Sequence, residues 1–591
     1  MRIFRLYLFV LLIVFISITV GCTNLNNQNS LTTTSTSISS ENQTTNITTV
    51  SSETTSMIST IITNQRNETE NIIMDFDLEQ INYQLPTKSF SLHSMISNNV
   101  IFQQNKEIRV FGQAQPKTVI LVKLTKDYDT SVHYQNYVIV PDNGEWIVTL
   151  PPMTASFDTY TLTVSDTVHE TTVANCLIGE VWIVGGQSNM ELKVKEMDLG
   201  YDLFKNVNEE YIRIFYQTRL DNNSNFPYEP AYDVSGGVWK SASSYDNVAQ
   251  SSAIGFSFAL KTFYSFVQYN QQVPIAIINT PIGGSQIHSW LPRAEITESS
   301  VLSDYVESLG YSLDTRGWNG QGWNNYNQVS ANFNKKIAPL TNFNIKGVAW
   351  YQGESDAVYS QSVVAIKALI DSWSECFNKN DELLYFALIQ IAPYDGTDPS
   401  LGNSKNNYWY TAFANHRRAQ FDVVMDPTYS KRTFLVPIYD IDLKWDVPST
   451  QFAWANPIHP VVKLPVGQRL SKMIMSFVYF NNDEYLAPVF ESLEMGDNTI
   501  TITFRNVGSG LTLFKDSAKG VTTMEVILKS GLRVNVSAEI ISSNQIQING
   551  VQISDIQFVA YSNLSRNEQS NLASSNLIPA IPFVVNVGDY S

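Results

Sequence analysis

The sequence predicts an α/β protein in which a mostly parallel sheet is flanked by helices, with a β-rich domain before it and another after it. Within residues 176–481, apolar strand-like runs alternate with helical stretches such as AIGFSFALKTFYSFVQ and SVVAIKALIDSWSECF; the runs are EVWIVGG, VPIAIINT, IKGVAWYQ, YFALIQIA and TFLVPIYD. Such alternation is typical of a parallel sheet covered by helices. On either side of this region, short β-branched runs are separated by Gly, Pro, Asn and Asp, which predicts strands without intervening helices.

These patterns divide the chain into five segments. Residues 1–22 are a secretory signal, and residues 23–85 are so rich in Ser, Thr and Asn that they cannot bury enough apolar surface to offset the entropy of ordering. Residues 86–175 predict a β-sandwich domain, residues 176–481 the α/β domain, and residues 482–591 a second β domain. We therefore expect a folded protein that follows a signal and a disordered tether.

The signal segment ends in a cysteine. Arg2 and Arg5 precede an apolar run, and the final four residues, Thr-Val-Gly-Cys22, resemble a bacterial lipoprotein cleavage box, in which the Cys becomes the lipid-bearing first residue. The alternatives are an ordinary cleaved signal and an uncleaved anchor. Each predicts a protein outside the cytoplasm, and the lipoprotein interpretation anchors it to the outer face of the cell membrane through Cys22.

Charge and cysteine content exclude several classes of partner. The formal net charge is −17 and no Lys/Arg-rich run is present, so we expect no nucleic-acid partner, because the phosphate backbone is bound mainly by clustered cations. The three cysteines are too few for a disulfide framework and lack the paired Cys/His spacing of a zinc site. We expect no metal and no cofactor.

A serine follows the first strand-like run of the α/β domain. Ser188 lies in GGQSNM, where Gly185 and Gly186 permit a close backbone approach and the residues after Ser188 can open a helix. We expect a sharp strand-to-helix turn with an exposed hydroxyl and a free amide. A serine in a glycine turn is common, so the other strand ends must supply the remaining chemistry.

Two further motifs follow later strand-like runs, and the carboxyl ends of parallel strands meet at one edge of a sheet. In PIGGSQIHSW, Gly283 and Gly284 leave backbone N–H groups that could point at an oxyanion. In YQGESD, the Gln352 side chain can donate another N–H, and Glu354 is a nearby carboxylate. These donors are what an acyl-transfer site needs around a serine nucleophile.

A general base is also required, because a serine hydroxyl is a weak nucleophile until a neighbour accepts its proton. Half of the six histidines lie in the first β domain, which leaves His288, His416 and His459. His459 lies in a loop just before the helix-like segment PVGQRLSKMIMSFVYF, the usual place for the last catalytic residue of such a fold. We expect His459 to be the base.

In order along the chain, GEVWIVGGQSNME, VPIAIINTPIGGSQIHSW, GVAWYQGESDA, HRRAQ, IHPVVKLPVGQRL and NLASSNLIPAIPF resemble the SGNH (GDSL-like) hydrolase superfamily, and within it the sialate O-acetylesterase family. The resemblance implies an SGNH-type fold and a serine esterase that removes acetyl groups from sialic acid or another acetylated glycan. It implies that Ser188 is the nucleophile and His459 the general base. It also implies an oxyanion hole formed by the Ser188 amide, Gly284 and Gln352.

The group that orients the base remains open. Many SGNH enzymes carry an Asp three residues before the His, and here that position is Asn456. In a serine protease, replacing the orienting Asp by Asn costs on the order of 10⁴ in turnover. A backbone carbonyl near Asn456 could fix the ring instead; the side-chain candidates are Asp440, Asp442, Asp446, Glu354 and Asn456 itself.

Residues beside the motifs could contact the sugar. We expect an aromatic wall and polar contacts from Asn189, His288, Trp290, Trp350 and Tyr351. Two other functions stay open. One is an esterase for acetylated xylan or another acetylated carbohydrate, because related esterases share the serine and QGES motifs. The other is a carbohydrate-binding lipoprotein with a decayed hydrolase core, which Asn456 motivates.

Overall fold

The computed structural model describes residues 88–218, 228–314, 325–357, 361–377, 383–396, 409–442, 458–514 and 520–590. The predicted signal, the tether and Cys22 lie outside these ranges, as do Asp446 and Asn456. Within the described ranges, no helix is long and apolar enough to cross a membrane. The same residues contain no cluster of three or more His, Cys, Asp or Glu side chains that could hold a metal ion.

The first β domain contains two sheets. One is antiparallel, in the order β1 (Ser91–Leu92), β3 (Ile108–Gln113), β6 (Glu145–Leu150). The other pairs β5 (His133–Ile139), β4 (Val119–Lys126) and β7 (Ser156–Ser165) with the first half of β8 (Glu170–Gly186), which also pairs with β2 (Ile101–Gln103). Buried and more exposed side chains alternate along β4 and β6, as expected for strands with one face on a core.

The central sheet has the order β10-β9-β11-β8-β12-β13-β14. Its pairs are parallel except β10 with β9. The strand bounds are β9 (Glu209–Tyr216), β10 (Val238–Ala242), β11 (Ile275–Asn279), β12 (Gly347–Tyr351), β13 (Tyr385–Ile389) and β14 (Thr433–Val436). The chain places β9, β10 and β11 on one side of β8 and then crosses to β12 on the other side. The carboxyl end of β8 is therefore a topological switch point, where α/β sheets bind their ligands.

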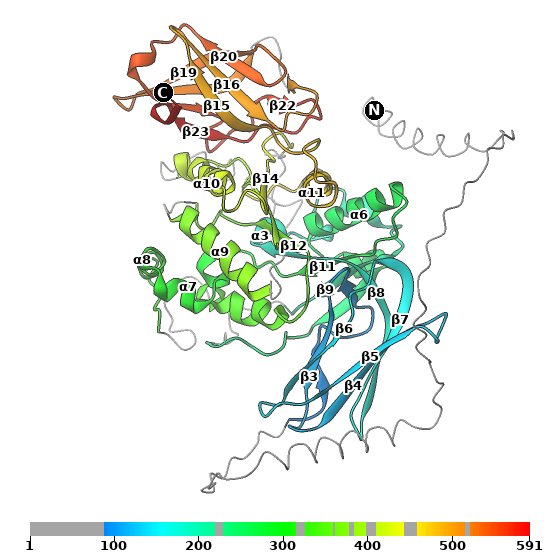
Figure 1. Cartoon of the computed structure of the whole chain (residues 1–591). Helices are drawn as coiled ribbons and strands as arrows, with labels where there is room; N and C mark the ends of the chain where they lie inside the picture. The colour runs from blue at the N-terminus through cyan, green and yellow to red at the C-terminus, as the bar shows by residue number, and fades with distance from the viewer. Residues whose placement is uncertain are drawn as a thin grey trace, which may run out of the picture. The chain divides into compact units, whose positions relative to one another are not determined.

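Strand β8 joins the two domains. It is 17 residues long, pairs with β7 and β2 at its start, and pairs with β11 and β12 at its end (Figure 1). The boundary predicted between residues 175 and 176 therefore falls inside one continuous strand. The residue after this strand, Gln187, leads directly to Ser188, so the first β domain and the turn that carries Ser188 share one element.

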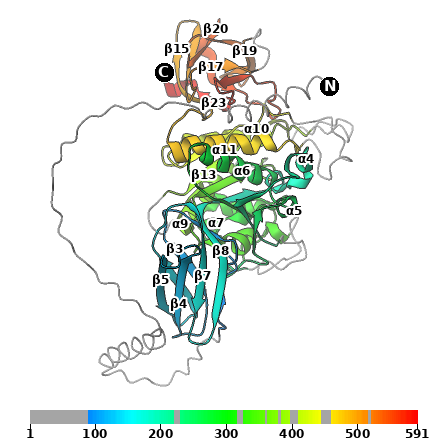
Figure 2. The ribbon, with the colours of Figure 1, turned by 90° about the vertical axis from the view of Figure 1, so that its right-hand side faces the viewer.

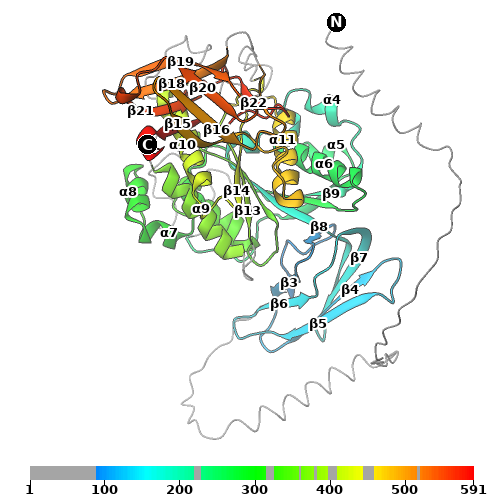
Figure 3. The ribbon, with the colours of Figure 1, turned by 45° about the horizontal axis from the view of Figure 1, so that its top comes forward.

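Helices cover both faces of the central sheet. α6 (Ala253–Gln268) and α11 (Leu464–Ile474) pack together on one face, and α9 (Ser362–Phe377) and α10 (Trp409–Met425) pack on the other (Figures 2 and 3). Thr262 and Ser471 hydroxyls lie 2.8 Å apart between α6 and α11. The shorter helices are α3 (Ser188–Glu191), α4 (Gly200–Phe204), α5 (Tyr245–Val248), α7 (Arg293–Glu298) and α8 (Ser300–Ser308). The predicted mixed α/β fold is confirmed.

The last domain is a seven-stranded antiparallel sheet in the order β15-β16-β20-β19-β18-β21-β23, with a separate pair β17-β22. Its strands are β15 (Val489–Met495), β16 (Thr499–Arg505), β17 (Leu511–Leu513), β18 (Val521–Leu528), β19 (Arg533–Ile540), β20 (Gln545–Asn549), β21 (Ile556–Tyr561), β22 (Leu572–Ser574) and β23 (Phe583–Asn586). The buried Arg417 of α10 donates to the carbonyl of Ser565 at 3.0 Å, and Tyr439 donates to the carbonyl of Ala580 at 2.7 Å. These bonds attach the last domain to the α/β domain.

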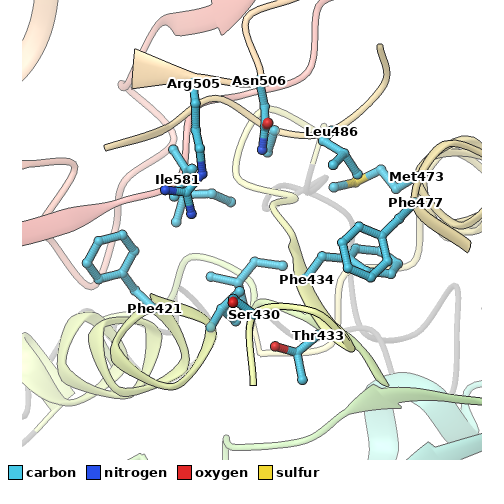
Figure 4. Close-up of a pocket in the computed structure, with 14 residues that line it drawn as sticks. Phe421, Ser430, Thr433, Phe434, Met473, Phe477, Leu486, Arg505, Asn506 and Ile581 are labelled. Atoms are coloured by element: carbon cyan, nitrogen blue, oxygen red, sulfur yellow. The ribbon is translucent and has the colours of Figure 1, made fainter. Parts of the chain in front are cut away.

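An apolar cavity of about 180 Å³ remains where the last two domains meet. Phe421 from α10, Phe434 from β14 and Met473 from α11 line it together with Ile581, and Arg505 reaches in from the end of β16 (Figure 4). Neither Ser188 nor His459 contributes to its lining, so this cavity is separate from the catalytic edge of the sheet.

The close approach at Gly186 predicts a stability effect. Gly186 has φ +128°, and a Cβ there would overlap the carbonyl of Tyr351, whereas Gly310 has φ +82° with open space around it. Gly310→Ala should cost about 1–2 kcal/mol through its backbone conformation alone. Gly186→Ala should cost about 1–3 kcal/mol more, through the overlap. Urea unfolding of the two variants measures the difference, and equal losses would contradict this packing.

Candidate active site

The turn that carries Ser188, the predicted nucleophile, has the predicted strand-to-helix form, and we call it the nucleophile turn. Ser188 is the first residue of α3, immediately after β8, and its side chain is half-buried. The amides of Met190 and Glu191 donate to the carbonyl of Gln187 at 2.9 Å each. No described residue accepts a hydrogen bond from the amide of Ser188, so this amide remains able to donate to a bound group.

Ser188 lies against a histidine. His459 Nε2 is 2.7 Å from Ser188 Oγ, which is hydrogen-bond distance. Burial, together with the positive charge of Lys463, lowers the pKa of His459 to about 4. His459 is therefore neutral at pH 7 and can accept a proton from the serine.

The glycine loop after β11 packs on the nucleophile turn. The amide of Gly283 donates to Glu191 Oε2 at 2.6 Å, and a Cβ on Gly283 would lie 3.4 Å from the Cβ of Ser188. The amide of Gly284, which has φ +75°, meets no acceptor among the described residues. The amides of Ser188 and Gly284 thus have no acceptor among the described residues, and Gly284 directly follows the Gly283 that packs on the turn at Ser188.

The prediction for Gln352 needs correction. Its Nε2 donates to Asp356 and, at 3.3 Å, to the carbonyl of Ser285, so the side chain holds the loop after β11 rather than offering a donor to an oxyanion. Asp356 also accepts from Tyr305 and, at 3.0 Å, from the amide of Ile287. A buried carboxylate needs these donors, and burial raises its pKa to about 6.

The predicted sugar contacts are also wrong, because all five residues are buried. Trp290, Trp350 and Tyr351 are buried, and the Trp290 and Trp350 rings pack edge to face at 5.5 Å. His288 is buried as well, with Nε2 2.7 Å from the carbonyl of Asn327. A side chain without solvent access cannot stack on a sugar. Trp350 and Tyr351 are the last residues of β12, a strand covered on both faces, and Trp290 ends the short 3₁₀ helix Ile287–Trp290.

Among the candidates for orienting the base, Asp440, Asp442 and Glu354 are described. Asp440 forms a paired salt bridge with Arg469, with distances of 2.7 and 2.6 Å. Asp442 is exposed. Glu354 is buried and accepts from Asn189 at 2.5 Å. The roles of Asp446 and Asn456 stay predictions, because both lie outside the described residues.

Asn189 has a structural position that the sequence did not reveal. It is buried, so it is not a sugar contact; its Nδ2 donates to Glu354 and, at 2.9 Å, to the carbonyl of Ile458. Its Oδ1 accepts from Lys463 Nζ at 2.6 Å. Burial raises the pKa of Glu354 to about 7 and lowers that of Lys463 to about 7. The positive charge of Lys463 favours the ionised form of Glu354, and the negative charge of Glu354 favours the protonated form of Lys463.

Sequence reasoning also missed Gln187 and Lys463. Gln187 Oε1 accepts from the amide of Ser355 at 3.1 Å, which ties the QGES loop to the nucleophile turn. One signal for Lys463 was available: a lone lysine in the apolar run HPVVKLPV has to find a buried partner. Gln187 gave no such signal, because its partners are backbone amides of a segment far away in the sequence.

Known proteins resemble this chain in sequence and in fold. Residues 178–397 match the family model described as carbohydrate esterase, sialic acid-specific acetylesterase. The sialate O-acetylesterase of Mus musculus is 26% identical over 412 residues, which cover 64% of this chain and 72% of the mouse protein. The human sialate O-acetylesterase is 25% identical over 430 residues, which cover 69% of this chain and 74% of the human protein. A carbohydrate acetylesterase from Xanthomonas citri has the same fold, with a TM-score of 0.67 and 24% identity over 84% of this chain and 99% of that one.

The structure places a serine hydroxyl against a neutral imidazole at the switch point of a parallel sheet. Together with these relatives, this pair defines the protein as a carboxylic-ester hydrolase. The matched region contains Ser188 and Gly284, and His459 lies beyond its end. Over residues 178–397 the chain resembles the sialic acid-specific acetylesterase family of carbohydrate esterases. The predicted resemblance is therefore confirmed.

The salt bridge of Asp440 generates a prediction. Asp440→Asn should lower kcat/KM for an aryl acetate by much less than the 10⁴-fold order expected for loss of an orienting acid, because Asp440 is engaged by Arg469. Steady-state kinetics measures this. A loss that approached four orders of magnitude would mean that Asp440 orients the base after all.

Proposed function

We propose that this protein is a sialate O-acetylesterase that removes O-acetyl groups from sialic acids through an acyl-enzyme formed on Ser188. The observation that carries the proposal is the 2.7 Å contact between Ser188 Oγ and His459 Nε2. The matching family model and the sialate O-acetylesterases of mouse and human support the substrate class.

In the first half-reaction, Ser188 Oγ attacks the acetyl carbonyl carbon while its proton passes to His459 Nε2. The carbonyl oxygen becomes an oxyanion, and the amides of Ser188 and Gly284 donate to it. The tetrahedral intermediate then collapses as the bond between the acetyl carbon and the sugar oxygen breaks. His459 returns the proton to that oxygen, which leaves as a sugar hydroxyl.

Water repeats the cycle in the second half-reaction. His459 accepts a proton from the water, whose oxygen attacks the acetyl group on Ser188. Breakage of the ester to Ser188 Oγ releases acetate, and the proton on His459 restores the serine hydroxyl. Because the base is neutral both before and after each half-reaction, its lowered pKa keeps it ready to act.

Location outside the cytoplasm is part of this proposal. It is supported by Arg2 and Arg5 before an apolar run that ends at Cys22 in a lipoprotein-like cleavage box. We infer that the mature protein is held at the outer face of the membrane through a lipidated Cys22. Cys22→Ala should release the protein from the membrane fraction, and unchanged partitioning would contradict the lipid anchor.

The substrate class can be tested by acetate release. Purified protein should hydrolyse a simple aryl acetate and O-acetylated sialic acid. Ser188→Ala and His459→Ala should each lower turnover by at least about 10³-fold, because the nucleophile and its base act as a unit. Ser131→Ala and His169→Ala, both exposed positions in the first β domain, serve as matched controls.

Activity on acetylated xylan without activity on O-acetylated sialic acid would contradict the substrate class and leave the esterase mechanism standing. An inert wild-type protein would contradict both, and would favour a carbohydrate-binding protein with a decayed site.

The lowered pKa of His459 predicts the acid limb of the pH profile. The base must be unprotonated, so activity should persist as the pH falls from 7 to 5 and should be lost as the pH passes through about 4. An ordinary histidine would lose activity near pH 6.5. The profile of kcat/KM for an aryl acetate locates the limb, and a limb near 6.5 would show that His459 is not desolvated as the structure has it.

A further inference from the structure

We propose that Asn189 and Lys463 are positioning residues, which hold the loop of the base against the nucleophile turn and so set His459 Nε2 against Ser188 Oγ. This inference rests on the proposed function. Neither side chain contacts Ser188 Oγ or His459 Nε2, the two atoms between which the proton is predicted to pass. Both residues therefore act through the placement of His459.

Asn189 connects the segment that carries Ser188 to the segment that carries His459 by a direct hydrogen bond. It directly follows Ser188, and its Nδ2 donates at 2.9 Å to the carbonyl of Ile458, the residue directly before His459. One side-chain hydrogen bond therefore joins the neighbour of the nucleophile to the neighbour of the base. A displacement of the Asn189 side chain would be passed on to His459 through a single peptide unit.

The side-chain amide of Asn189 has only one orientation that satisfies its partners. Nδ2 faces two acceptors, the Ile458 carbonyl and the Glu354 carboxyl group, and Oδ1 faces the Lys463 ammonium at 2.6 Å. A flip of the amide would place oxygen against both acceptors and NH₂ against the cation. Because all three partners are part-buried or buried, such a flip would leave polar groups unpaired away from water.

Lys463 holds the far end of the same loop. Lys463 directly precedes α11, and the packing of α11 on α6 fixes that helix. The Lys463 ammonium donates to Asn189, the same residue that binds the carbonyl of Ile458. Between the two ends, the amide of Asp198 donates to the carbonyl of Val461 at 3.0 Å. The loop from Ile458 to Lys463 is thus held at its beginning, its middle and its end.

Lys463 also acts on the base through its charge. The titratable groups around it are His459 on its own loop, Glu354 from the segment after β12 with Asp356 behind it, and Tyr351 at the end of β12, whose ring centroid lies 5.6 Å from Lys463 Nζ. Removal of the ammonium removes a repulsion that lowers the pKa of His459. It also leaves the Glu354 carboxyl group without its cation, and any negative charge there raises the pKa of His459 further.

Three variants test the inference in the full chain, with an aryl acetate as substrate. Asn189→Asp is isosteric and turns an oxygen toward the Ile458 carbonyl and Glu354, and Asn189→Ala removes the contacts. Both should lower kcat by about 10²-fold with little change in KM, because a small misplacement of a catalytic group costs that much. Lys463→Met should also lower kcat and should move the acid limb to higher pH. Lys472→Met, an exposed lysine of the same helix, is the matched control and should change neither.

The outcomes separate the inference from the function on which it rests. Thermal melts and circular dichroism of each variant identify a loss of fold, and the pH limb of Lys463→Met is measured only on folded protein. The inference would be overturned if the wild-type protein were active, folded Asn189→Asp kept the same kcat, and Lys463→Met kept the acid limb of its pH profile at the same pH. An inert wild-type protein would overturn the proposed function instead.

Discussion

The hydrogen bond between Ser188 and His459 joins two residues that are 271 positions apart, so it forms only when the whole α/β domain is assembled. Ser188 is placed by β8, which is central to the sheet and continuous with the first β domain. His459 is placed by the loop before α11, and α11 is fixed on α6. The packing of these two helices against the sheet therefore decides whether His459 reaches Ser188, and the buried Asn189 is hydrogen-bonded to Ile458, the residue before His459.

The parts that the sequence predicted are those with a strong local pattern. Apolar runs bounded by turns predicted strands β8, β11, β12, β13 and β14, because a strand buried on both faces is apolar throughout. Ser188, Gly284 and His459 were predicted because each follows or precedes a regular element and its chemistry has few alternatives. The parallel sheet then explains why three distant segments meet at one edge.

The parts that the sequence could not give depend on long-range contacts. Gln352 and Trp290 stand beside the catalytic motifs and were assigned to the oxyanion and the sugar, but Gln352 holds Asp356 and Trp290 lies in the core. A residue next to a motif points toward the site or away from it according to the strand's alternation and the loop's turn, and neither is visible in one sequence. Asn189 and Lys463 have partners far apart in the chain for the same reason.

The central claim is that Ser188 is a nucleophile activated by His459. The most direct test is mass spectrometry after treatment of the purified protein with a fluorophosphonate, followed by peptide mapping. The account predicts one adduct, on Ser188, and a rate of labelling that falls by orders of magnitude in His459→Ala, because the hydroxyl then has no base. An adduct on another residue, or labelling of Ser188 at an equal rate without His459, would contradict it.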